Sequence, residues 1–188
     1  VSSSAASDVY KRQITISAGS TTGTVSFTPT DDSVYEGNET ATIAISSVTG
    51  EASESGTQAV TITITENESA PTVTLYMKIA SLGFNYISTS ISEAYSSTSI
   101  RIEAKLSGAT DEDVTVALST SGTATEGTDY TDGSGNLDDI TISAGSTTGS
   151  INLIRVNDSV YEGDETATIA ISSVSGGSAT ESLSLIHI

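Results

Sequence analysis

The chain has 188 residues, and its 24 acidic and 6 basic side chains give a formal net charge of −18. That charge repels phosphate backbones and anionic membrane surfaces, which argues against nucleic acid as a partner. No apolar run approaches the roughly 18 residues needed to cross a bilayer, and the absence of cysteine excludes disulfides, thiolate metal sites and cysteine nucleophiles.

The two ends of the chain do not read like the rest of it. Residues 1–13 and 182–188 resemble translated sequencing adapters, so we expect neither segment to belong to the fold. The only histidine, His187, lies in the second segment, and we expect no functional role for it.

An internal repeat organises the sequence. Residues 14–50 align with residues 140–176 at a constant offset of 140−14 = 126 residues, and 27 of these 37 positions are identical. The block before the second copy, 70–139, has no counterpart before the first, whereas the first copy continues through a further alternating segment to Glu68. This indicates tandem duplication, with 14–68 the C-terminal half of a module and 69–181 a nearly complete module whose last strand is missing or replaced.

Alternating and β-branched segments predict the strands. In chain order these segments are 24–27, 40–46 and 59–65 in the first copy, then 72–76, 98–106, 114–119, 140–142, 150–156 and 166–172. Clusters of Gly, Ser, Asp and Asn between them are typical of turns, and no segment has helical periodicity. The pattern predicts an all-β protein built of antiparallel sandwich modules joined by a short, stiff junction at 66–71.

Acidic residues gather in the loops between these strands. The repeated loop reads DDSVYEGNE at 31–39 and NDSVYEGDE at 157–165, while Asp129 follows a Gly-rich turn and Glu93 lies near the end of an early strand. Two carboxylates about 4 Å apart repel by roughly 4 kcal/mol at an effective dielectric of about 20, so a convergent set favours a bound cation. Oxygen ligands without His or Cys favour calcium, although the spacing leaves a solvated acidic rim as the alternative.

These segments resemble a known family. ATEGTDYT, followed by VNDSVYEGDETATIAIS, is similar to the Calx-beta repeat, which is named from sodium–calcium exchangers and is abundant in bacterial surface proteins. The resemblance implies immunoglobulin-like sandwiches in tandem, with calcium bound at one end by carboxylates from several loops. The ligand candidates that it implies are Glu93, Asp129, Asp158, Glu162 and Glu165 in the second copy, and Asp31, Asp32, Glu36, Glu39, Glu66 and Glu68 in the first.

The sequence departs from the family pattern at two places. Asn157 replaces the first of two aspartates that are common before the V-Y-E element, and Glu66, Asn67 and Glu68 replace an aspartate cluster. Both changes reduce the ligand charge and predict weaker binding or fewer ions.

Other features favour a non-catalytic role. Tyr130 and Tyr161 stand beside acidic positions, and we expect their rings to pack on the end of the sandwich. Paired carboxylates also serve glycoside hydrolysis, but a chain with no Trp and only 5% aromatic residues has little with which to build a sugar-binding cleft. We therefore predict that the chain is not an enzyme.

The resulting functional prediction is a calcium-binding spacer repeat of a large extracellular or cell-surface bacterial protein. Calcium would rigidify the junction between neighbouring repeats of the same chain. Two alternatives stay open: an adhesive module that binds a carbohydrate or a protein receptor directly, and a calcium-independent spacer. Because a truncated module leaves sheet edges unpaired, a strand-swapped dimer is a further expected partner state.

Overall fold

The computed structural model describes residues 13–79, 85–86, 100–182 and 185–187. The chain divides into two compact units, 1–32 and 33–188. In the first unit the described residues 13–32 form turns and irregular backbone without a strand. No helix long and apolar enough to cross a membrane occurs in the described part of the chain.

The second unit contains the strands. They are β1 (Val34–Tyr35), β2 (Glu39–Ala44), β3 (Ala59–Ile64), β4 (Thr72–Ile79), β5 (Asn85–Tyr86), β6 (Ile100–Leu106), β7 (Ala109–Thr110), β8 (Val114–Gly122), β9 (Tyr130–Thr131), β10 (Ile140–Ile142), β11 (Thr148–Arg155), β12 (Ala167–Ser175), β13 (Thr180–Glu181) and β14 (Leu185–His187).

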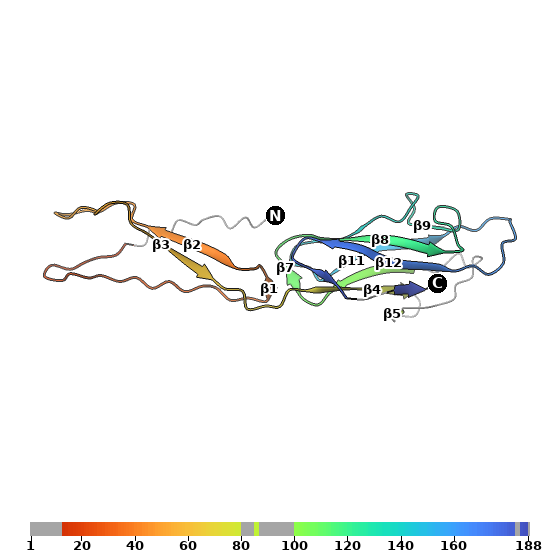
Figure 1. Cartoon of the computed structure of the whole chain (residues 1–188), viewed down its shortest axis with the longest axis horizontal. Coiled ribbons are helices and arrows are strands. Elements are labelled where there is room, and N and C mark those ends of the chain that lie inside the picture. The colour runs from red at the N-terminus through yellow and green to blue at the C-terminus, as the bar shows by residue number, and fades with distance from the viewer. Residues whose placement is uncertain (1–12, 80–84, 87–99, 183–184, 188) are drawn as a thin grey trace. The chain divides into compact units, whose positions relative to one another are not determined.

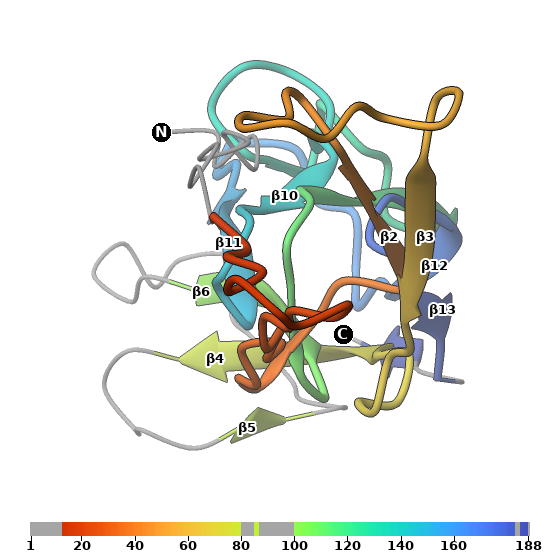
Figure 2. The same ribbon diagram turned by 90° about the vertical axis from the view of Figure 1, so that its left-hand side faces the viewer.

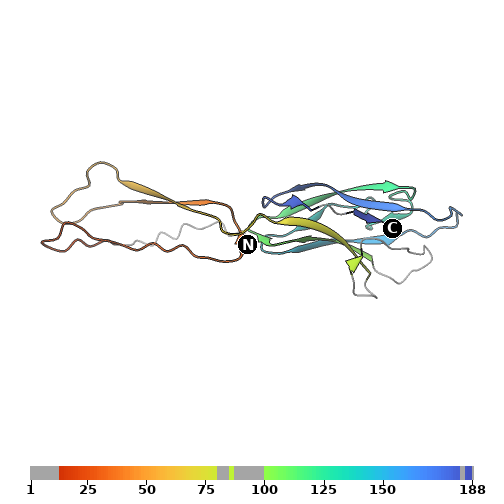
Figure 3. The ribbon, with the colours of Figure 1, turned by 60° about the horizontal axis from the view of Figure 1, so that its bottom comes forward.

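Two sheets of the second copy form a sandwich (Figures 1 and 3). One sheet has the order β10-β8-β12-β14, and the other has the order β13-β4-β6-β11-β9 with β5 paired to β4. The β4–β6, β6–β11, β8–β10 and β8–β12 pairs are all antiparallel. The predicted all-β sandwich is thus confirmed.

The core lies between the two sheets. Residues of β4 alternate strictly between buried and more accessible positions, as expected for a strand with one face on a core. Fully buried side chains come from both sheets, among them Leu75 and Ile102 from one sheet and Val116, Ile142 and Ile169 from the other. Every member of the buried apolar cluster lies between Val73 and Ile186, so this module carries its own core.

Most predicted strands are present, with ends shifted by a few residues, but the strand predicted at 24–27 is wrong. Val25 and Phe27 are each 41% exposed and belong to no strand. The segment at the equivalent position of the second copy lies in β11, where six consecutive residues pair with β6. An alternating pattern supplies one apolar face, but a strand also needs a hydrogen-bonded neighbour, and 24–27 is paired with no strand of the described residues.

The structure differs from expectation at the end of the second copy. Residues 182–188 were expected to lie outside the fold, yet β14 pairs antiparallel with β12 and Ile186 is fully buried. Ile169 pairs with Ile186, just as Ile43 of β2 pairs with Val60 of β3, and both partners are displaced by the repeat offset of 126 residues. β14 therefore occupies the position of the closing strand.

Two small sheets complete the unit. β2 and β3 form an antiparallel hairpin from the first copy, visible side by side in Figure 2. β1, also from the first copy, pairs in parallel with β7 of the second, with Val34 opposite Ala109 and Tyr35 opposite Thr110. The junction between the copies is thus a backbone-paired contact within residues 33–188.

Candidate metal centre

Asp129 sits in a tight turn immediately before β9. Its backbone N–H donates to the Thr125 carbonyl over 2.9 Å, and its own carbonyl accepts from the Val156 N–H over 2.9 Å. The Thr125 N–H also donates to the Asp129 carboxylate and so orients that side chain. Because β9 pairs antiparallel with the end of β11, Asp129 lies where the acidic loop after β11 begins.

Glu162 and Glu165 belong to that loop, which runs from the end of β11 to the start of β12. The far end of the loop is fixed by Thr166, whose carbonyl accepts from the N–H groups of Thr123 and Ala124 over 2.9 and 3.0 Å. The Thr166 N–H in turn donates to the Thr123 hydroxyl over 2.9 Å. Both ends of the loop are therefore tied to the segment that carries Asp129.

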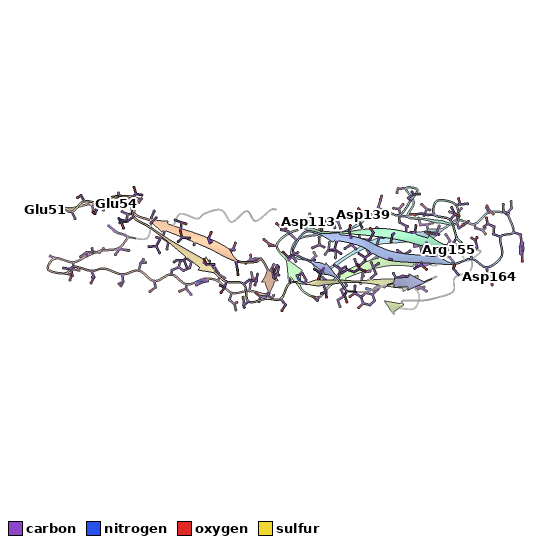
Figure 4. All side chains as sticks on the ribbon, viewed as in Figure 1. Glu51, Glu54, Asp113, Asp139, Arg155 and Asp164 are labelled. Carbon is purple, nitrogen blue, oxygen red and sulfur yellow. The ribbon has the colours of Figure 1, made fainter. Side chains whose placement is uncertain are left out.

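These ties bring three carboxylates together. Asp129, Glu162 and Glu165 each place a carboxylate oxygen within 4.8 Å of the other two, and in the described part of the chain no other set of three or more metal-binding side chains does so. Asp129 is half-buried and Glu162 is exposed. Arg155 and Asp164 mark the same end of the sandwich in Figure 4.

The donor set suits calcium. Calcium binds oxygens at about 2.3–2.6 Å, so two ligands on opposite sides of one ion are about 5 Å apart, and the three carboxylates fit within a single coordination sphere. All donors are hard oxygens, and carboxylates can bind through one oxygen or two. Water molecules would supply the remaining ligands of an exposed site.

The other candidates of the second copy stand differently. Asp158 is not a member of the three-residue cluster, and its carboxylate accepts from the Val160 N–H over 2.6 Å in a local turn. Glu93 lies outside the described residues. The resemblance implied both as ligands, and both stay predictions.

In the first copy the candidates Asp31, Asp32, Glu36, Glu39, Glu66 and Glu68 are all described, but no three of them form such a cluster. The Glu66 carboxylate instead accepts four backbone N–H bonds, from Glu36, Gly37, Asn67 and Glu68, at 2.6 to 2.9 Å. These bonds, first that of Glu68 and then that of Glu36, lower the pKa of Glu66 to about 2. Glu66 thus organises the junction loop through its charge.

Sequence reasoning missed two carboxylates that build the loop beside the cluster. Asp132 accepts from the hydroxyl and the N–H of Ser134, both at 2.7 Å, and these bonds hold the pKa of Asp132 at about 2. Glu126 accepts from the Thr120 hydroxyl over 2.8 Å and from the Leu137 N–H. For Asp132 the available signal was an Asp that opens a DGSGN turn, a position where Asp commonly caps the backbone.

The two tyrosines have opposite environments. Tyr130 is buried in the core, as expected, and burial raises the pKa of its hydroxyl. Tyr161 is 96% exposed, so the expectation that its ring packs on the sandwich is wrong. Tyr161 lies in the middle of an inter-strand loop with Val160 also exposed beside it, whereas Tyr130 belongs to a paired strand.

Comparison with known proteins places these features in a family. A search of the curated proteins found no match. The family model described as the Calx-beta domain matches residues 8–68 and 78–186, which cover both copies and include the three clustered carboxylates. The chain belongs to the Calx-beta domain family.

Proposed function

We propose that the chain is a calcium-binding spacer from an extracellular or cell-surface protein, with calcium stiffening the modules and their junctions. Calx-beta domains are associated with calcium, are non-catalytic and occur in extracellular regions of proteins. We accordingly propose no enzymatic role for this chain.

The convergence of Asp129, Glu162 and Glu165 carries the proposal. Asp129 lies more than thirty residues before Glu162 and Glu165, which share one loop, yet the carboxylate oxygens of all three lie within 4.8 Å of one another. Carboxylates so close repel one another, and a divalent cation removes that repulsion. The family and the geometry thus point to the same ligand.

Calcium at this cluster would act mechanically. One ion bound by all three side chains cross-links the turn before β9 to the loop between β11 and β12. An ion that binds only the folded state stabilises it by about 2.7 kcal/mol at a hundredfold excess over the dissociation constant. The loop it fixes is the counterpart of the first-copy loop that contacts the next module, which supports a role at junctions.

Thermal unfolding in calcium and in chelator tests this function. For extracellular sites with dissociation constants of about 10⁻⁴ to 10⁻³ M, 10 mM calcium should raise the melting temperature of the chain by about 3–10 °C. The double substitution Glu162→Gln and Glu165→Gln should abolish the rise, because it removes two of the three charges.

The repeat offers a matched control. Glu36→Gln with Glu39→Gln changes the equivalent positions of the first copy, where the structure gathers no cluster, and should leave the calcium response intact. Equal melting temperatures of the unsubstituted chain in calcium and in chelator would refute the proposed function.

A further inference from the structure

The same six residues, DSVYEG, occur twice and have two different environments. In the first copy Val34 and Tyr35 are half-buried and form β1, paired with β7. In the second copy Val160 is 61% exposed and Tyr161 is 96% exposed. At the end of the six residues the backbone is similar, since Gly37 has φ 78° and Gly163 has φ 79°. The two loops therefore differ in what contacts them.

The edge that receives β1 is built by the second module itself. Thr110 is buried, its hydroxyl donates to the Glu112 carbonyl over 2.7 Å, and its carbonyl accepts from the Gly145 N–H over 2.7 Å. Gly177 packs so closely that an added Cβ would lie 2.8 Å from the Thr110 side chain. These bonds and the Gly177 contact lie within the second module and do not involve β1.

A short backbone pairing joins the first-copy loop to the β7 edge. Besides the paired register, the Asp111 N–H donates to the Tyr35 carbonyl over 3.3 Å. A cavity of about 220 Å³ beside it is lined by Tyr35, Ala109 and residues of both copies. The residues that pair with the edge are repeated without change, because Asp158 to Gly163 repeats Asp32 to Gly37. The first-copy loop is held in addition by the Glu66 carboxylate, which accepts from the Glu36 and Gly37 N–H groups.

The loop and the edge lie at opposite ends of the sandwich. In Figures 1 and 3, β7 is at one end and the loop between β11 and β12 is at the other, and Figure 4 shows the same separation between Asp113 and Asp164. A module with a donor loop at one end and a matching acceptor edge at the other forms a heterologous, head-to-tail contact.

We propose that Val160 and Tyr161 are a docking element for the β7 edge, Ala109–Thr110, of another copy of this module. They would pair with it as Val34 and Tyr35 do within this chain. The inference rests on the proposed function only in treating the module as a link in an array. Between covalently joined modules the effective concentration is high, so even this small contact would be occupied.

The full chain tests the proposal, because its own β1 competes for the edge. Substituting Val34→Gly and Tyr35→Gly should release β1 and open the edge while Val160 and Tyr161 stay available. This variant should associate head to tail, seen as a sedimentation coefficient that rises with concentration and as concentration-dependent amide shifts at Ala109, Thr110 and Asp111.

A matched variant isolates the second loop. Adding Val160→Gly and Tyr161→Gly to the opened chain should weaken the association by about tenfold or more, because it removes two side chains from the contact and makes the paired backbone more costly to order. Neither pair of substitutions touches the buried cluster between Val73 and Ile186, and dispersed core amides would verify that the sandwich is folded.

Measuring association in chelator separates this test from the calcium proposal, because the residues expected to pair include none of the three clustered carboxylates. Association of the opened variant in chelator, lost on removal of Val160 and Tyr161, supports docking whatever the calcium response. A monomeric opened variant at millimolar concentration would overturn it. Association that survives in the four-residue variant would also overturn it and would indicate strand exchange at the β2–β3 hairpin.

Discussion

The segments ITISAGSTTG at 14–23 and at 140–149 are identical in sequence and form the same turn. The Ser20 N–H donates to the Ser17 carbonyl over 2.9 Å, and Ser146 donates to Ser143 over the same distance. Gly19 and Gly145 have φ 82° and 74°, a left-handed conformation that glycine adopts without strain. The turn is therefore encoded locally.

Strand formation beside that turn is not encoded locally. In the second copy Ile140–Ile142 form β10, paired with β8, and Ile142 is 0% exposed. In the first copy the same three residues form no strand, and Ile16 is 57% exposed. Strand formation and burial therefore depend on a paired neighbour, which 140–142 has in β8 and 14–16 does not have among the described residues.

The β2–β3 hairpin also separates strand pairing from burial. It keeps the pairing register of β12 and β14, but Ile43 is far more exposed than Ile169, its counterpart in the core. Two strands joined by one connection can pair without a second sheet. They cannot bury either face unless another layer packs against it.

Matched substitutions in the identical segments should show the largest difference. Ile142→Ala removes a fully buried side chain and should lower the free energy of unfolding by about 2–5 kcal/mol. Ile16→Ala changes an exposed side chain in the same local sequence and should stay within about 0.5 kcal/mol. Chemical denaturation followed by circular dichroism measures both, and equal losses would contradict the assigned difference in burial.

A smaller effect concerns pH at the junction. The folded-state pKa of Glu66 is lowered from 4.5 to about 2, so its contribution to stability is complete above about pH 4.5 and is lost as the pH falls towards 2. An NMR titration of the Glu66 carboxyl carbon should give a midpoint near 2, with the amides of Glu36 and Gly37 shifting together with it.

Glu66→Gln serves as the control, because it should remove that titration from both amides. A Glu66 midpoint near 4.5 in the unsubstituted chain would show that the four backbone bonds do not form in solution.

Periodicity predicted the long strands because each of them buries one face. It could not predict β7, β9 or β13, since two residues carry no period and their pairing is decided by neighbours distant in sequence. Residues 182–188 were expected to lie outside the fold because they resemble a translated adapter, and the pairing of Ile186 with Ile169 shows that this expectation was wrong.

The sequence also predicted the candidate site only in part. The motifs named Asp129, Glu162 and Glu165, but spacing could not separate them from Asp158, whose carboxylate closes its own turn. The distinction depends on the ties through Thr166 and Val156, which bring together loops that are distant in the sequence.

Mapping calcium binding residue by residue tests the central claim most directly. On adding calcium to the full chain, we expect amide shifts at 125–131 and 158–166, around Asp129, Glu162 and Glu165, with much smaller changes at the equivalent first-copy loop 32–40. Absence of shifts at 125–131 and 158–166, or shifts of equal size in both copies, would contradict the account.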